Sequence, residues 1–157
     1  MLTSVNRLIG RKVLWRDQEL GHVERAVADA ESRRLHGLVI RRGMGSARWV
    51  PADSIRLEGR SCVLKEQPVR LPKQEPMEVR YAVLASGQRA GEVCDVILHA
   101  DTLRIAALEV TQGPLYRLMG RCGYASGFRR GEADEVMIGP LLTWTQLLRQ
   151  LGEEAEA

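Results

Sequence analysis

The feature that most constrains this chain is an internal repeat. The stretch GHVERAVADAESRRLHGLVI, residues 21–40, returns as GEVCDVILHADTLRIAALEV, residues 91–110, at a constant offset of 70 residues. Between residues 13–40 and 83–110, 8 of 28 positions are identical without a gap. Repetition at a fixed offset is typical of a duplicated structural unit. The sequence therefore predicts two similar units in tandem.

Each copy has the pattern of β-structure, with short runs of Val, Leu and Ile separated by polar turns. Asp29 is expected to accept backbone N–H groups in an Asx turn, and Pro51 to lie at a strand end or sheet edge. Many short strands with tight turns favour a small barrel, because closure removes exposed edges. The expected strands are residues 12–15, 22–28, 35–40, 49–57 and 62–66, then 81–85, 92–99, 104–110 and 135–140.

The expected domains are residues 1–66, a proline-rich connector at 67–78, and residues 79–157. Prolines four residues apart favour an extended, semi-rigid connector. The tail TWTQLLRQLGEEAEA is predicted to be a short α-helix capped by Thr143, with an apolar stripe that is typical of core packing. That stripe consists of Trp144, Leu147, Leu148 and Leu151. The predicted fold class is therefore all-β, with two tandem small barrels and a short C-terminal α-helix.

The second copy is expected to carry an insertion. Aligning Pro51 with Pro140 requires an offset of 89 instead of 70, which implies 19 extra residues within the segment 111–135. A connection of this length inside a compact unit is usually functional or disordered. We therefore treat it as a candidate binding loop.

The sequence predicts no catalytic residue, metal site or cofactor. Its histidines and cysteines are widely spaced, with no CxxC pair, so neither a zinc site nor a disulfide framework is indicated. Cys94 and Asp95 beside His99 are the nearest approach to a reactive group, but strand alternation places Cys94 on the opposite face from both neighbours. A buried structural thiol is the preferred interpretation. The residues considered were His22, His36, His99, Cys62, Cys94 and Cys122.

Arginine supplies 20 of the 23 basic residues. Its planar fork suits carboxylate and phosphate groups, although coding bias in an Arg- and Ala-rich proteome is the preferred explanation of this composition over a selected nucleic-acid surface. Residues 32–52 and 110–131 contain several arginines and no acid. Equivalent folds would place both basic loops at the same end of their units, where they could form one anion-binding surface. The alternative is ordinary solvated surface. The candidate binding residues are Arg41, Arg42, Arg48, Trp49, Tyr116, Arg117, Arg121, Tyr124, Phe128, Arg129 and Arg130.

The run LIGRKVLWRDQELGHVERAVADAESRRLHGLVI, followed by WVPADSI, resembles the PRC-barrel family. This small β-barrel is shared by the cytoplasmic domain of reaction-centre H subunits and the C-terminal domain of the ribosome maturation factor RimM. The second copy lacks the opening Leu-Ile-Gly and has His99 in place of Asp29. The matching residues are Leu8, Ile9, Gly10, Gly21, His22, Val23, Asp29, Val50, Pro51 and Asp53, then Gly91, Val93, Asp95 and Pro140.

The resemblance implies a docking module without an active site. The preferred hypothesis is a cytoplasmic, non-enzymatic protein-interaction module that binds a protein partner, with homodimerisation through the C-terminal helix as one possibility. The alternative is an RNA- or ribosome-associated assembly factor that uses the arginine-rich loops. Attachment to a membrane complex is less favoured, because the 136–148 run is too short to span a bilayer and no anchor precedes the first unit.

Overall fold

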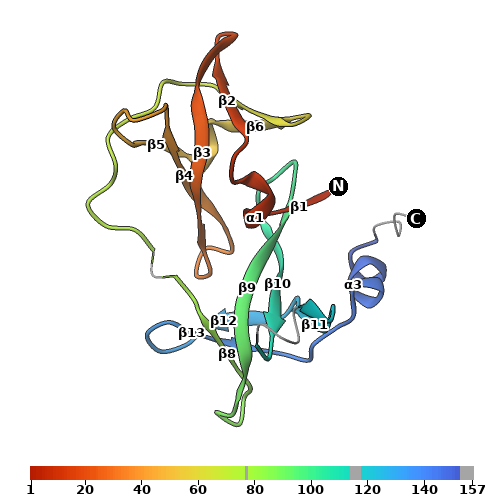
Figure 1. Ribbon diagram of the computed structural model, residues 1–157. Helices are drawn as coiled ribbons and strands as arrows, with labels where there is room; N and C mark the ends of the chain where they lie inside the picture. Colours follow the sequence, from red (N-terminus) through yellow and green to blue (C-terminus); the bar gives the residue numbers. More distant parts are fainter. Residues whose placement is uncertain (77, 114–117, 153–157) are drawn as a thin grey trace.

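The computed structural model describes residues 1–76, 78–113 and 118–152, and shows a mostly β protein with a short C-terminal helix (Figure 1). The first repeat forms one sheet, drawn in red to yellow in Figure 1, and the second repeat forms another, drawn in green to blue. The prediction of a β-rich chain with a terminal helix is therefore confirmed.

The first sheet contains six strands in the order β5-β4-β3-β2-β7-β6. Neighbouring strands are antiparallel except for β2 and β7, which run parallel. A 3-10 turn, Ala52–Ser54, separates β5 from β6. The strands are β2 (Lys12–Trp15), β3 (Gln18–Asp29), β4 (Arg34–Arg41), β5 (Arg48–Pro51), β6 (Ile55–Glu58) and β7 (Ser61–Leu64).

The second sheet follows the same plan, with the order β11-β10-β9-β8-β13-β12 and the parallel pair β8–β13. An additional N-terminal strand, β1 (Leu2–Ser4), pairs with β9. Matching orders and matching parallel pairs confirm the duplication. The strands are β8 (Tyr81–Val83), β9 (Arg89–His99), β10 (Ile105–Thr111), β11 (Cys122–Ala125), β12 (Phe128–Arg130) and β13 (Glu135–Ile138).

Irregularities of the strands are duplicated as well. The pairing of β3 with β4 skips Glu24 and His36, and the pairing of β9 with β10 skips Cys94 and Ala106. Each pair of skipped residues is related by the 70-residue offset of the sequence repeat. Because a β-bulge bends its strand and increases the local twist, both sheets curl in the same way.

One glycine in each repeat is required by close packing. Gly21 and Gly91 have φ angles of 134° and 157°, in a region that side chains rarely adopt. A Cβ atom at either position would lie 2.4 Å from a backbone carbonyl oxygen, that of Arg41 or of Thr111. The shared glycine in the repeat therefore reflects the same close approach of two strands.

The 19-residue insertion is not present. Leu38 pairs with Val50, twelve residues later, whereas Leu108 pairs with Ala125, seventeen residues later. The connection in the second repeat is therefore longer by only five residues. The segment 111–135 is not an inserted loop, because it contains strands β11 and β12, the counterparts of β5 and β6. The prediction was wrong because it treated Pro51 and Pro140 as equivalent positions. It did so because strands β11 and β12 are short and have a weak sequence pattern.

Neither sheet closes into a barrel within the described residues, because no pairing joins β5 to β6 or β11 to β12. Each sheet is instead extended at one edge by the segment that follows its last strand. Trp49 of β5 exchanges two backbone hydrogen bonds of 2.8 Å with Val69, and Tyr124 of β11 does the same with Leu142 at 2.9 and 2.8 Å. The expected closure of each unit into a barrel is therefore not observed among the described residues.

Several local predictions are confirmed. Asp29 accepts a hydrogen bond of 3.0 Å from the amide of Glu31, and Pro51 ends the edge strand β5. Thr143 caps α3 (Trp144–Leu151) by accepting from the amide of Gln146, whose side chain accepts from the Thr143 amide in return. Helix α1 (Val5–Leu8), near the N-terminus, is a single turn. Among the described residues, no helix has both the length and the apolar character needed to cross a membrane.

The two repeats meet where their long hairpins turn. The Leu35 amide donates to the Leu103 carbonyl at 2.8 Å, and the Ile105 amide donates to the Arg33 carbonyl at 2.9 Å. Arg33 and Leu35 correspond to Leu103 and Ile105 at the 70-residue offset, so each bond is the counterpart of the other. The contact therefore has the pattern of a two-fold symmetric interface, formed here within one chain. A single core of buried residues, including Leu38 and Leu108, runs through both repeats.

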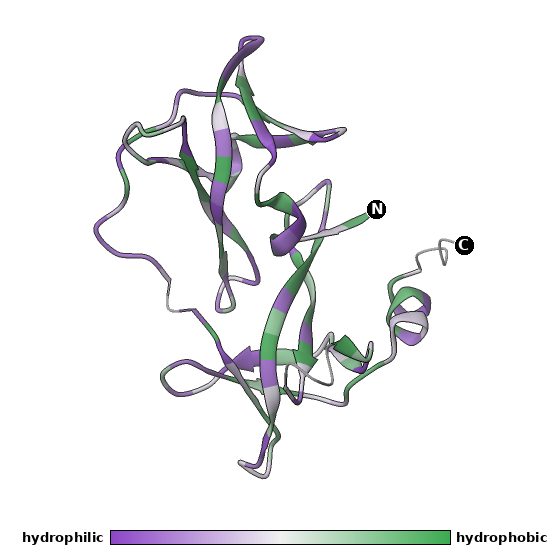
Figure 2. Cartoon of the chain, in the orientation of Figure 1, coloured by the Kyte–Doolittle hydropathy of each residue, from purple (hydrophilic) through white to green (hydrophobic). Residues whose placement is uncertain are grey.

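The proline-rich connector passes outside the first sheet and is mainly hydrophilic (Figure 2). It has little regular secondary structure but contacts the sheet at two points. Val69 pairs with Trp49, and the Glu75 carboxylate binds the Arg25 guanidinium through two hydrogen bonds of 2.7 Å. These contacts fix its path, and its first residues form one wall of a pocket at the end of the first sheet.

Candidate partner-binding pocket

Two of the predicted arginines, Arg42 and Arg48, lie together at the end of the first sheet. They flank the connection between β4 and β5 and are both exposed. Within the described part of the chain, neither forms an ion pair, whereas Arg41 is held by Glu24 at 2.9 Å. Arg42 and Arg48 therefore keep their donors available for a partner.

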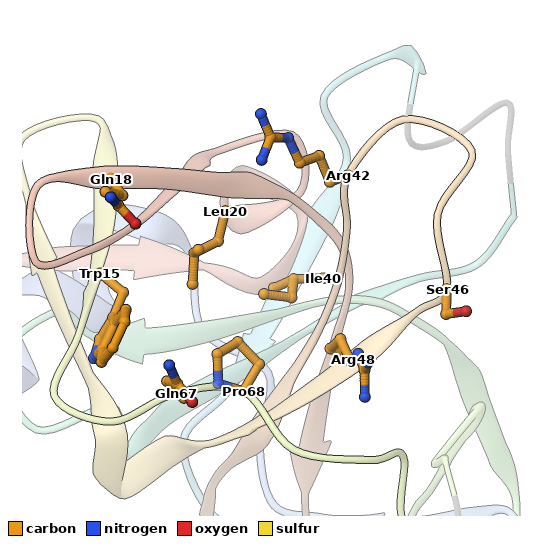
Figure 3. Close-up of a pocket in the computed structure, with 9 residues that line it drawn as sticks. All are labelled: Trp15, Gln18, Leu20, Ile40, Arg42, Ser46, Arg48, Gln67 and Pro68. Carbon is orange, nitrogen blue, oxygen red and sulfur yellow. The ribbon is translucent and has the colours of Figure 1, made fainter.

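These arginines border a pocket of about 550 Å³ (Figure 3). Its apolar floor comes from three elements that are distant in sequence: Leu20 of β3, Ile40 of β4 and Pro68 of the connector. Figure 3 shows Trp15 and Gln67 on one side of this floor, and Arg42, Ser46 and Arg48 on the other. The arrangement offers a hydrophobic surface next to two cations.

The pocket has a positive electrostatic character. The described residues that line it include no Asp or Glu. The Arg16 guanidinium stacks over the ring of Trp15, one of the lining residues, at 4.6 Å. The two cations of the pocket, Arg42 and Arg48, beside its apolar floor favour a ligand that combines carboxylate or phosphate groups with an apolar group.

Other predicted site residues have structural roles. Trp49 is 6% exposed and packs beside Val27 and Val39, and Phe128 is 6% exposed beneath the Arg33 guanidinium, 4.0 Å from its ring. Their placement argues against the binding role assigned to them from sequence. Aromatic residues next to arginines are ambiguous in sequence, because the same pair can pack internally or bind a partner.

The remaining predicted residues are not brought into the pocket. Tyr124 is half-buried against Trp144, and the Arg130 side chain donates to the Ala133 carbonyl. Arg129 of β12 is exposed, and so is Arg121, which precedes β11. Tyr116 and Arg117 lie outside the described residues.

The two basic loops do not form a common surface. Arg34 and Arg104 pair antiparallel at the contact between repeats, so β4 and β10 run in opposite directions away from it. Each basic loop begins at the far end of its strand, and Figure 1 accordingly shows β5 and β11 on opposite sides of the molecule. The expectation of one joint surface is wrong, because two-fold packing separates the equivalent ends of the units.

Seven of the nine pocket residues were missed by sequence reasoning. Their only sequence signal is that a tryptophan ends a strand and that a Gln-Pro pair opens the connector. The floor forms only after the connector folds back along β5, which no local pattern specifies. The missed residues are Trp15, Gln18, Leu20, Ile40, Ser46, Gln67 and Pro68.

The structure also brings together three potential metal ligands whose spacing in the sequence matches no metal-binding motif. The ligand atoms of Cys94, Glu109 and Cys122 all lie within 4.8 Å of one another, on strands β9, β10 and β11. The Tyr124 side chain hydrogen-bonds to Glu109, and burial together with the nearby carboxylate raises the pKa of this phenol to about 12. Cys62, by contrast, is fully buried in the first sheet, and burial raises the pKa of its thiol to about 11.

Comparison of the sequence with protein families and curated proteins identifies no relative. No protein-family model matches the chain, and no curated protein is detectably similar to it in sequence. The function of the molecule is therefore inferred from its sequence and its geometry.

Proposed function

We propose that this protein is a non-enzymatic docking module that binds an acidic, partly apolar peptide segment of a partner protein. The observation that carries this proposal is the placement of Arg42 and Arg48 beside the apolar floor of Leu20, Ile40 and Pro68. An apolar side chain of the partner would cover the floor, and its carboxylates would bind the guanidinium groups through paired hydrogen bonds.

The architecture supports this proposal. We infer that each sheet is an incompletely closed unit of the PRC-barrel type. Support comes from the repeated bulges at Glu24 and Cys94, and from the edge pairings of Trp49 with Val69 and Tyr124 with Leu142. A curled sheet of this kind presents a pocket at its end.

A peptide partner fits the pocket better than RNA. Binding to a nucleic-acid backbone draws on many phosphate contacts, but several arginines are already engaged by acids within the protein. The pocket floor is aliphatic, and Arg16 already stacks over one face of the Trp15 ring, the only aromatic ring among the described lining residues, so the pocket offers few surfaces for base stacking. The engaged arginines are Arg25 with Glu75, Arg34 with Asp53, and Arg41 with Glu24.

A displayed peptide library tests this proposal. The full chain should select peptides in which Asp or Glu flanks a large apolar residue. A synthetic peptide of the selected sequence should then lose at least about tenfold in affinity for the double variant Arg42→Ala/Arg48→Ala, because charge-assisted hydrogen bonds contribute roughly 1.5–3 kcal/mol each. Fluorescence polarisation of the labelled peptide measures both affinities.

The matched control is Arg56→Ala/Arg60→Ala, which removes two exposed arginines from the β6–β7 hairpin, away from the pocket. It should bind the selected peptide as the parent does. Equal losses of peptide affinity in both double variants would indicate a general effect of charge. That result would reject the assignment of peptide binding to this pocket. Tight, pocket-dependent binding of a single-stranded RNA oligonucleotide, with no acidic peptide selected, would instead support the RNA-associated alternative.

A further inference from the structure

A second site lies on the outer side of the second sheet, away from the arginine pocket. Tyr124 of β11 stands directly opposite Glu109 of β10, and Cys122 precedes Tyr124 by two residues, so all three side chains share one face. Cys94 joins them from β9, where its thiol donates to the Glu109 carboxylate at 3.2 Å. Three strands therefore direct two thiols and one carboxylate to one point.

The bulge at Cys94 explains this convergence. Regular alternation would place Cys94 on the face opposite to Glu109, because Asp95 is the residue paired with Glu109. The bulge adds one unpaired residue to β9 and turns the Cys94 side chain toward Glu109. Asn6 of α1 fixes this local backbone, since its side-chain amide donates to the Cys94 carbonyl and its main-chain amide donates to the Asp95 carboxylate.

We propose that Cys94, Glu109 and Cys122 bind a zinc-class divalent cation, with a fourth position left for water or an exogenous ligand. Two thiolates and one carboxylate form a donor set suited to Zn²⁺. Two sulfurs bound to one tetrahedral zinc at about 2.3 Å stand ~3.8 Å apart. The ligand atoms already lie within 4.8 Å of one another, so small side-chain rotations complete the site.

The first repeat provides an internal comparison. Strand pairing makes Glu109 equivalent to Val39 and Cys122 equivalent to Ala47. In the first repeat, this position is an apolar cluster in which Val39 packs with Val27, Trp49 and Ala47. The third position, equivalent to Cys94, is Glu24, which is ion-paired with Arg41. The first repeat therefore has apolar residues at two of the three positions, so a carboxylate at 109 and a thiol at 122 are not required by the architecture, which supports a ligand-binding role.

Strand order favours a shared ion over a disulfide. Cys94 and Cys122 lie on β9 and β11, which are separated by β10. Strands two positions apart stand roughly 9.6 Å from each other in a regular sheet, whereas a disulfide requires Cα atoms within about 7 Å. A metal ion placed above Glu109 can contact both sulfurs without moving either strand.

Tyr124 acts as a positioning residue for this site. Its hydroxyl hydrogen-bonds to the Glu109 carboxylate, and its ring packs against Trp144 of α3, with 5.0 Å between ring centroids. Partners of this kind hold a ligand in its binding orientation. The C-terminal helix therefore supports the metal site through one aromatic contact.

Metal titration of the full chain, purified with a non-thiol reductant, tests this inference. Equilibrium dialysis against Zn²⁺ should give one bound ion per chain, and Co²⁺ should produce a thiolate-to-metal charge-transfer band. Both signals should be absent in Cys94→Ser and Cys122→Ser. Glu109→Gln, which preserves the side-chain shape, should weaken Zn²⁺ binding by more than roughly tenfold. Tenfold is the smallest loss expected when a residue that only hydrogen-bonds to a metal ligand is removed.

Cys62→Ala is the matched control, because it removes the third cysteine from a different sheet and should leave the stoichiometry at one. Circular dichroism establishes that each variant is folded. Stoichiometric binding that persists in the folded double variant Cys94→Ser/Cys122→Ser would overturn the assignment. So would failure of the parent to bind Zn²⁺ or Co²⁺ while thiol titration shows all three cysteines reduced.

Discussion

Arg34 and Arg104, which occupy equivalent positions in the two repeats, face each other across an antiparallel bridge. The hydrogen bonds on either side of this bridge are exchanged by the same two-fold relation. The preceding residues, Arg33 and Leu103, share a left-handed conformation with φ angles of 61° and 59°. The interface between the repeats is therefore symmetric in its backbone, even where its side chains differ.

Arg33→Ala should destabilise the fold. The Arg33 guanidinium donates to the carbonyls of Phe128 and Ser126 at 2.7 and 3.3 Å, and stacks on the Phe128 ring. Loss of these contacts across the interface should lower the free energy of unfolding by about 2–3 kcal/mol, measured by urea denaturation. Arg34→Ala is the control, because its surface ion pair with Asp53 should contribute at most about 1 kcal/mol. Similar values for both variants would contradict the proposed importance of the Arg33 contacts.

Gly21→Ala and Gly91→Ala should each lower the free energy of unfolding by about 1–3 kcal/mol, because the added methyl group would collide with a backbone carbonyl. Thermal or urea unfolding measures the loss. Gly127→Ala, where a methyl group meets no atom within 4 Å, should change stability by no more than about 0.5 kcal/mol. A large effect in only one repeat would show that the two close approaches are not equivalent.

Stability should fall at alkaline pH because of Cys62. Burial raises the pKa of this thiol from 9.0 to about 11, so the unfolded chain loses the proton first as the pH rises. The stabilisation from the neutral buried thiol is fully present below about pH 9 and is lost progressively toward about pH 11. Cys62→Ala should remove this component, which appears as a smaller drop in the urea midpoint between about pH 8 and about pH 10.5. An identical drop in the variant would assign the effect to other groups.

Binding of the acidic peptide should weaken as salt concentration rises. The guanidinium groups of Arg42 and Arg48 are exposed, so their attraction to carboxylates is screened within about 10 Å at 0.1 M ionic strength. Leu20→Ala should instead reduce affinity at every salt concentration, since it removes part of the apolar floor. Fluorescence polarisation over a salt series separates the two contributions. A Leu20→Ala loss that vanishes at high salt would contradict a direct apolar contact.

Tyr124→Phe should weaken Zn²⁺ binding by about 10–100-fold while leaving one site per chain. The substitution keeps the ring contact with Trp144 and removes only the hydroxyl that holds Glu109. Competition with a chromophoric chelator measures the affinity. A complete loss of the site, or unchanged affinity, would reject the positioning role.

Local sequence patterns were sufficient for much of the fold. The repeat, most core strands, the turn at Asp29 and the helix cap at Thr143 depend on neighbouring residues, and all are confirmed. Strands β11 and β12 were mistaken for an inserted loop, because they are short and contain glycine and arginine. Strand alternation also failed at Cys94, where a bulge reverses the side-chain direction.

The candidate sites were less predictable because both depend on long-range contacts. Arg42 and Arg48 were identified from charge alone, but the floor beside them needs Pro68 of the connector. Cys94 and Cys122 lie too far apart in sequence for any ligand-spacing rule, and only the order of the strands brings them together. Trp49 and Phe128 were assigned to binding because sequence does not distinguish a buried aromatic residue from an exposed one.

Joining two equivalent units in one polypeptide has a consequence for how the protein can diversify. In an assembly of identical subunits, every substitution occurs twice, and a feature that suits one half must be tolerated by the other. Here Arg48 corresponds to Gly123, and Glu109 corresponds to Val39. Each half can therefore specialise independently, while the shared backbone contact preserves the partnership between them.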